Sequence, residues 1–100
     1  MTRIYAEQDG QRCTISAQGH ATGSVEACAA ISGILYALAG YVTNAQQERP
    51  IEVYTWIMES GKVLLDFNGG GETAAAFEMA VIGLLQIAQA HPEQVCMETA

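Results

Sequence analysis

A histidine and a cysteine, His20 and Cys28, are separated by seven residues at the start of a long apolar stretch. We expect Cys28 about one turn inside a helix, where the partial positive charge of the helix N-terminus favours the thiolate. His20 is expected at the end of a strand, one short loop away, so that its ring lies near the sulfur. A cysteine beside a histidine at a helix start is an arrangement that activates a thiol nucleophile. On spacing alone, a small buried hydrophobe and a solvated loop histidine explain the pair more simply.

Four stretches of alternating apolar and polar residues must position that pair. Asp9-Gly10 and Ser60-Gly61 are turn signals, and they divide the stretches into two hairpins. Each strand is expected to turn one face to the core and the other to water. The predicted strands are residues 2–7, 12–18, 51–59 and 62–67.

Helical periodicity follows each hairpin. The first predicted helix starts at Val25, and Ser24 or Thr22 can cap it. Alanines and glycines fill most of its other positions, so we expect a central helix that is covered on several sides. The second helix is predicted over residues 73–90, with Pro92 just beyond its end. The inward stripes are Ile31, Ile34, Leu35, Leu38 and Val42 in the first helix and Phe77, Ala80, Leu84 and Ile87 in the second.

The order ββαββα predicts an α+β fold with a four-stranded, mostly antiparallel sheet and two helices packed on one face. Residues 95–97 are expected to add only a short edge strand. Residues 1–100 show no repeat and no linker, which predicts a single domain. The three glycines at residues 69–71 lack the Lys-Ser/Thr of a phosphate-binding loop and therefore predict a flexible connection.

Composition narrows the class of partner. Eleven acidic and four basic residues give a net charge of −7, which disfavours nucleic acid and anionic membranes and suits a basic peptide or protein. Three unpaired cysteines, with no signal peptide before the first strand, predict a cytoplasmic protein. A chain of this length buries only roughly 60–65% of its unfolded surface, so dimerisation would supply useful further burial.

No metal, cofactor or membrane span is expected. His20 and His91 lie 71 positions apart, and no cluster of cysteines and histidines has zinc-ligand spacing. His91 is instead expected at the C-terminal end of the second helix, where a histidine is favourable. The densest apolar run, residues 27–42, is 16 residues long. It is shorter than the roughly 20 residues that a bilayer requires.

Two short motifs carry a resemblance to a known family. Gly-His-Ala at residues 19–21, with Cys-Ala-Ala-Ile-Ser at residues 28–32, resembles the ribosomal-processing cysteine protease family, often called Prp. The order of elements, the Glu-Arg-Pro break at residues 48–50 and His-Pro-Glu-Gln-Val at residues 91–95 are also similar to that family. The resemblance therefore extends over essentially the whole chain.

The resemblance implies a small homodimeric thiol endopeptidase that removes an N-terminal extension from a large-subunit ribosomal protein. By residue match, His20 corresponds to the catalytic histidine and Cys28 to the nucleophile. Ser32, on the same helix face as Cys28, matches a serine that supports the site. Backbone N–H groups at residues 25–28 are candidates for stabilising the oxyanion.

The loop between the histidine and the cysteine departs from the family. It has only seven residues, and the acidic residue expected three places before the cysteine is replaced by Val25. Glu26 follows and is a candidate supporting residue; Glu26 and Asn68 are also candidates for orienting His20. Because the family loop covers the substrate, two hypotheses remain. One is an endopeptidase with altered specificity, and the other is a catalytically inactive dimeric module that binds a peptide or protein.

The remaining conspicuous side chains have structural interpretations. Tyr54, Trp56 and Met58 alternate along one predicted strand face, which favours a dimer seam over a peptide groove. Cys13 alternates with core residues and is expected to be buried, whereas Cys96 is expected in the C-terminal segment without a chemical role.

Overall fold

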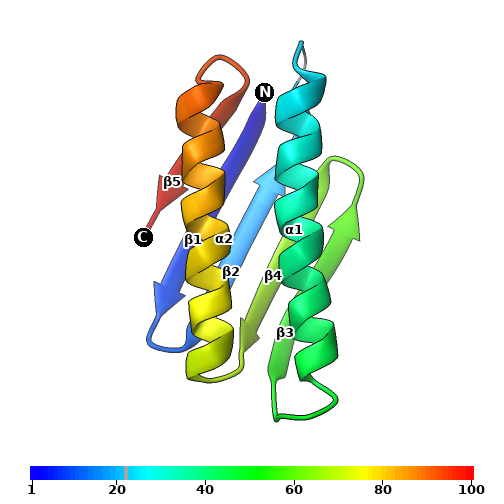
Figure 1. The fold of residues 1–100 in the computed structure, drawn as a ribbon, viewed down its shortest axis with the longest axis vertical. Helices are drawn as coiled ribbons and strands as arrows, with labels where there is room; N and C mark the ends of the chain where they lie inside the picture. Colours follow the sequence, from blue (N-terminus) through cyan, green and yellow to red (C-terminus); the bar gives the residue numbers. More distant parts are fainter. Residues whose placement is uncertain (22) are drawn as a thin grey trace.

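Seven elements follow one another in the order ββαββαβ in residues 1–21 and 23–100, which the computed structural model describes. Both helices lie across the same face of one sheet (Figure 1). The strands are β1 (Thr2–Asp9), β2 (Arg12–Gln18), β3 (Glu52–Glu59), β4 (Lys62–Asn68) and β5 (Val95–Thr99), and the helices are α1 (Val25–Ala45) and α2 (Gly71–Ala90).

The sheet is five-stranded and mixed, with the order β3-β4-β2-β1-β5. Neighbouring strands are antiparallel except β1 and β5, which run parallel with Thr2 opposite Val95. The α+β class and the order of the first six elements are as predicted, but the expectation of a four-stranded sheet is wrong. The signal of β5 is weak because only Val95 and Met97 turn apolar side chains toward the core.

Each helix returns the chain along the length of the sheet. α1 connects β2 to β3 and α2 connects β4 to β5, so each helix joins two strands of the same direction. β5 therefore runs parallel to β1. Because Arg12 is opposite Asn68 and Gln18 is opposite Lys62, the two hairpin turns lie at opposite ends of the sheet. The N-terminus of each helix thus lies at the end of the sheet that carries the turn of the other hairpin (Figure 1).

The core forms between the helices and the inward faces of the central strands, as the alternation predicts. The rings of Phe67 and Phe77 meet edge to face with centroids 6.0 Å apart, which joins β4 to α2. Trp56 contacts Phe67 in the same manner at 6.4 Å. The buried residues of the strands include Ile4, Ala6, Cys13, Ile15, Ala17, Leu65 and Phe67.

A β-bulge in β3 corrects one sequence-based prediction. The register with β4 shifts between Val53 and Thr55, so strict alternation fails at Tyr54. Trp56 lies opposite Leu65 and faces the helices, whereas Tyr54 lies on the other face of the sheet. Tyr54 therefore does not share a face with Trp56 and Met58, and the predicted single stripe along β3 is wrong. One inserted residue is enough to reverse a side chain because the strand period is two.

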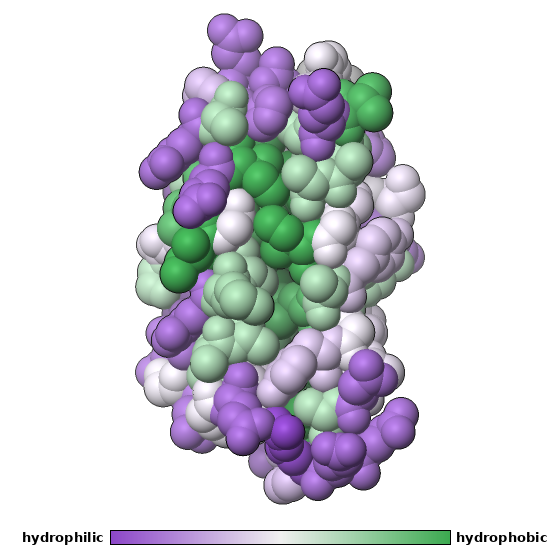
Figure 2. Space-filling model, viewed as in Figure 1, coloured by the Kyte–Doolittle hydropathy of each residue, from purple (hydrophilic) through white to green (hydrophobic). Residues whose placement is uncertain are grey.

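The two helices are covered on one side only (Figure 1), which corrects the expectation of a central first helix that is covered on several sides. Ser24 caps α1 by accepting a hydrogen bond from the Ala27 N–H at 3.0 Å, while the alternative cap, Thr22, lies outside the described residues. In an apolar segment of 18 consecutive residues in each helix, 28% of the residues of α1 and 22% of those of α2 are buried. Both helices are long and apolar enough to cross a membrane by length and composition alone, yet each packs a buried stripe into the core. Their outer surface forms an apolar band between two hydrophilic ends (Figure 2).

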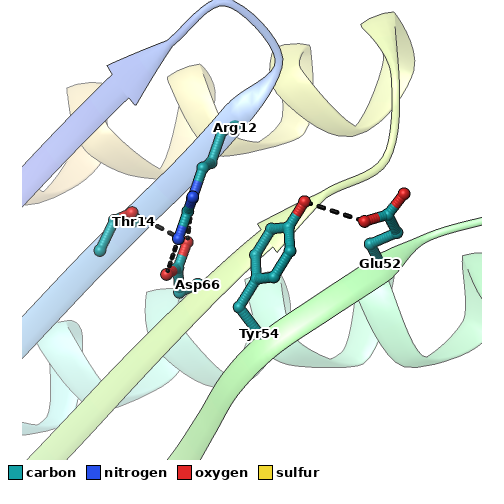
Figure 3. A network of polar contacts seen from close by, with 5 residues as sticks. All are labelled: Arg12, Thr14, Glu52, Tyr54 and Asp66. Carbon is teal, nitrogen blue, oxygen red and sulfur yellow. Dashed lines mark hydrogen bonds and ion pairs between the residues drawn. The ribbon is translucent and has the colours of Figure 1, made fainter.

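The opposite face of the sheet carries a polar network on β2, β3 and β4 (Figure 3). Arg12 donates two hydrogen bonds to Asp66, at 3.1 and 2.8 Å, and the Thr14 hydroxyl donates to the same carboxylate at 3.0 Å. The guanidinium also lies 4.3 Å from the centroid of the Tyr54 ring, whose hydroxyl donates to Glu52. These contacts tie the two hairpins together across their inner strands.

Candidate active site

His20 lies just beyond β2, at the end of the sheet where the β3–β4 turn closes. Gly19 donates its N–H to the carbonyl of Gly61 at 2.9 Å, which fastens the end of β2 to that turn. A side chain at Gly19 would collide with the main-chain carbonyl of Met1, so no larger residue fits before the histidine. The His20 ring lies against Gly61, with Nε2 and Cε1 as the closest ring atoms.

Cys28 occupies the fourth position of α1 and is half-buried. Its N–H donates to the Ser24 carbonyl at 3.2 Å, which is the first full turn of the helix. Ser32 follows four residues later and Tyr36 four after that, so the three side chains share one helix face. Ile31 and Leu35 beside them are buried in the core, whereas Ser32 and Tyr36 are exposed, so this face lies at the edge of the contact between α1 and the sheet.

His20, Cys28 and Ser32 line one cavity of about 230 Å³. It opens between the N-terminal half of α1 and the β3–β4 turn. Ile31, Met58 and Val63 supply an apolar wall, and polar side chains stand at the turn. The histidine and cysteine that the sequence singles out therefore line the same cavity from different elements. They are the two side-chain types that thiol-based acyl transfer requires, a proton acceptor and a nucleophile.

The backbone N–H groups at the start of α1 differ in whether they donate a hydrogen bond to another described residue. The Ser24 N–H donates to Ala21, and the N–H groups of Ala27 and Cys28 donate to Ser24. In the described part of the chain, this leaves Val25 and Glu26 as the first-turn amides without such a bond. Among residues 25–28, Ala27 and Cys28 therefore already use their N–H groups within the helix start, and Val25 and Glu26 stay as the candidates for oxyanion stabilisation.

Two candidate residues lie away from the cavity. Glu26 is exposed in the first turn of α1 and is not among the residues that line the cavity. Asn68 ends β4 opposite Arg12, whereas β2 leads to His20 from Gln18. The six residue steps from Arg12 to Gln18 span roughly 20 Å at the rise of an antiparallel strand, so Asn68 lies too far away to orient His20.

The β3–β4 turn and Tyr36 are parts of the cavity that sequence reasoning missed. Glu59, Ser60, Gly61 and Lys62 line it from a hairpin some forty positions away from His20 in the sequence. Their turn chemistry is visible in the sequence, but their position beside the histidine depends on the pairing of β2 with β4. Tyr36 follows Ser32 by four residues, as Ser32 follows Cys28, and this spacing is the sequence signal that could have placed Tyr36 near the cavity.

The other cysteines and the second histidine lie outside the cavity. Cys13 is buried, as predicted, and burial raises the pKa of its thiol to about 11. Cys96 is exposed on β5. His91 forms the C-cap of α2, where its backbone N–H donates to the Ile87 carbonyl at 2.9 Å.

The fold is similar to solved structures of low sequence identity. The essential ribosomal processing protease Prp from S. aureus, in complex with a covalently linked product peptide, superposes with a TM-score of 0.76 at 12% identity over 100% of both chains. Its complex with a substrate peptide gives a TM-score of 0.71 at 12% identity, again over 100% of both chains. SMU.848 from Streptococcus mutans gives 0.72 at 16% identity, covering 99% of this chain and 93% of that one.

No protein-family model and no curated protein sequence matches this chain. The resemblance to Prp that the sequence indicates is confirmed at the level of the fold, over the full length of the chain.

Proposed function

We propose that the protein is a thiol endopeptidase with Cys28 as nucleophile and His20 as general base. The observation that carries the proposal is the cavity that both side chains line, at the start of α1. The fold adds support, because a structure of the same fold holds a covalently linked product peptide and another holds a substrate peptide. The spacing of His20 and Cys28 in the sequence does not by itself favour a thiol site, whereas the cavity that both side chains line supports one.

The proposed reaction assigns one step to each of these groups. His20 takes the thiol proton, and the Cys28 sulfur attacks the scissile carbonyl carbon. The N–H groups of Val25 and Glu26 donate to the oxyanion as the C=O bond becomes single. The C–N bond then breaks, the protonated imidazole gives its proton to the leaving amine, and water hydrolyses the thioester to restore the thiol. Ser32, one turn from the sulfur, supports the site from the same helix face.

The proposed substrate is the N-terminal extension of a large-subunit ribosomal protein, processed in the cytoplasm during ribosome biogenesis. The motifs at residues 19–21 and 28–32 support this choice through their resemblance to Prp. The net charge of −7 supports it independently, because ribosomal proteins are basic and opposite charge accelerates encounter. The steps above use only protein side chains, amides and water.

A homodimer is part of the same proposal. The outer helical surface exposes large apolar side chains, including Tyr36 at 68%, Met79 at 73% and Ile82 at 57%. A contiguous apolar band of this kind is typical of a protein interface (Figure 2). Sedimentation should show a dimer at micromolar concentration, and Met79→Glu should shift it toward the monomer. A wild-type monomer under those conditions contradicts the dimer but leaves the protease proposal intact.

Cleavage of the proposed substrate, a ribosomal protein of the same cell that still carries its N-terminal extension, tests the activity. The wild type should convert the extended form to the mature form, and Cys28→Ala should abolish conversion. Cys96→Ala is the matched control, since it removes an exposed cysteine outside the cavity and should cleave like the wild type. No cleavage by the wild type, or equal cleavage by Cys28→Ala, rejects the proposal.

A catalytically inactive peptide-binding module is the second candidate, favoured by the short loop of seven residues between His20 and Cys28. Iodoacetamide labelling followed by mass spectrometry separates the two. An activated nucleophile makes Cys28 react faster than the exposed Cys96, while Cys13 stays unlabelled in the folded protein because burial raises its pKa to about 11. Equal rates at Cys28 and Cys96, with peptide binding preserved in Cys28→Ala, would favour the inactive module.

A further inference from the structure

The β3–β4 turn contains a glycine whose missing side chain leaves room for the imidazole of His20. Gly61 has a φ of +77°, in the left-handed region that L side chains rarely adopt. A Cβ added there would lie 2.7 Å from Nε2 and 3.1 Å from Cε1 of His20. The first distance is shorter than any ordinary carbon contact, and the obstacle is a ring that can yield only by moving.

The same residue holds the chain next to the histidine. The Gly61 carbonyl accepts a hydrogen bond from the Gly19 N–H at 2.9 Å, which fixes the backbone just before His20. The position where Gly61 lacks a Cβ lies against the His20 ring. The β3–β4 turn, which belongs to the second hairpin, therefore limits where the imidazole of His20 can lie. Sequence separation conceals this relation, because His20 and Gly61 are 41 positions apart.

We propose that Gly61 is a positioning residue of the thiol site, which sets the place of the His20 ring relative to Cys28. The catalytic part of the proposal rests on the function proposed above, whereas the contact between turn and ring does not. Replacing Gly61 by alanine pushes the imidazole away from the turn and changes its distance to the sulfur. A shift of about 1 Å in a catalytic group can lower the rate about 10²-fold.

Gly10 in the other hairpin turn provides a matched control. Its φ of +61° imposes the same kind of backbone strain on alanine, but a Cβ there would meet nothing within 4 Å. Gly10→Ala and Gly61→Ala should therefore lower the melting temperature by similar amounts. Any effect on His20 that appears only in Gly61→Ala comes from the contacts of this turn with the histidine segment, through the ring or through the Gly19 N–H.

Nuclear magnetic resonance measures that contact without any substrate. In the wild type, a nuclear Overhauser effect should join the Gly61 α-protons to the His20 ring. Gly61→Ala should shift the His20 ring resonances and leave those of His91 unchanged, and Gly10→Ala should move neither. If Gly61→Ala fails to fold, the wild-type Overhauser effect decides: its absence overturns the proposal.

Cleavage and labelling then test the catalytic consequence. Gly61→Ala should lower kcat/KM about 10²-fold relative to Gly10→Ala and should slow iodoacetamide labelling of Cys28 toward the rate found in His20→Ala. Unchanged His20 resonances, or equal kcat/KM in the two glycine variants, overturn the positioning role. If the His20 resonances move but the wild type cleaves nothing, the contact is supported and the endopeptidase proposal alone fails.

Discussion

The N-termini of α1 and α2 are equivalent positions in the two ββα halves of the chain, and they differ in what they hold. Each helix starts where the sheet ends beside the turn of the other hairpin, and each has a glutamate in its first turn (Figure 1). The fourth helical position is Cys28 in α1 and Ala74 in α2. The first is half-buried in a cavity, whereas the second is buried in the core.

The two ends also differ in their connections and caps. Six residues separate β2 from α1, whereas only Gly69 and Gly70 separate β4 from α2. Ser24 caps α1 with its hydroxyl, but the N-cap of α2, Gly70, has no side chain to do so. The longer connection leaves space for His20 and a cavity, and the shorter one closes the other end. One architecture thus places a cavity with a histidine and a cysteine at the start of α1 and a buried alanine at the start of α2, through a few loop residues.

Replacing each histidine tests whether His20, beside the N-terminus of α1, has a role that His91 lacks. His20→Ala should lower the cleavage rate about 10²- to 10⁴-fold, because it removes the group proposed to take the thiol proton. His91→Ala, at the C-cap of α2, should cleave at the wild-type rate. Comparable losses of kcat/KM in both variants would contradict a specific role of His20 in cleavage.

The caps are the next test. Ser24→Ala should lower the free energy of unfolding by about 1 kcal/mol, since the Ala27 N–H loses its acceptor. Ser24→Thr should restore most of the loss. Urea unfolding of the wild type and the two variants measures the free energy of unfolding. An unchanged value in Ser24→Ala would mean that α1, like α2, does not depend on a side-chain cap.

The first turn of α2 contains a buried hydroxyl group, that of Thr73, whose removal can be tested. Thr73 is fully buried and, within the described residues, its hydroxyl has no hydrogen-bond partner, whereas the equivalent residue of α1 is Ala27. Thr73→Val should therefore raise the free energy of unfolding by about 1 kcal/mol. The control is Thr43→Val, whose exposed hydroxyl donates to the Ala39 carbonyl at 2.9 Å and which should change stability by less than about 0.5 kcal/mol. Destabilisation by Thr73→Val would show that the hydroxyl has a role at this end.

The smallest effect concerns the network that joins the two halves behind the helices (Figure 3). Arg12 and then Thr14 hold the pKa of Asp66 below its usual value. The carboxylate therefore contributes stability above its unfolded pKa of about 3.9, and this is lost as the pH falls through the lower folded value. Asp66→Asn should cost less than about 1 kcal/mol at pH 7, and the difference from wild type should shrink below about pH 4. A difference that stays constant from pH 7 to pH 3 would exclude this linkage.

The sequence predicts most of the scaffold because its signals are local. Alternation identifies the inward residues of β1, β2 and β4, and helical spacing identifies both buried stripes. The errors arise where distant segments decide. Tyr54 changes face because β3 pairs with β4 through a bulge, and β5 joins the sheet through only two inward apolar residues, Val95 and Met97.

The one-sided covering of α1 is an error of a different kind. Alanine and glycine suit a buried helix, but they also suit an exposed surface that awaits another molecule, and composition does not distinguish the two. Only the position of α1 on the outer layer shows that its apolar band faces outward (Figure 2).

By itself, the sequence determined the two candidate side chains for thiol chemistry, the helix start that carries Cys28 and the strand end that precedes His20. Those properties depend on neighbours within a few residues, through turn chemistry, capping and periodicity. The tertiary structure decided that both side chains reach one cavity, that Glu26 and Asn68 lie outside it, and that Gly61 supports the imidazole. These relations depend on the pairing of β2 with β4, which brings together residues about forty positions apart. Such pairing is a property of the assembled sheet and not of any single segment.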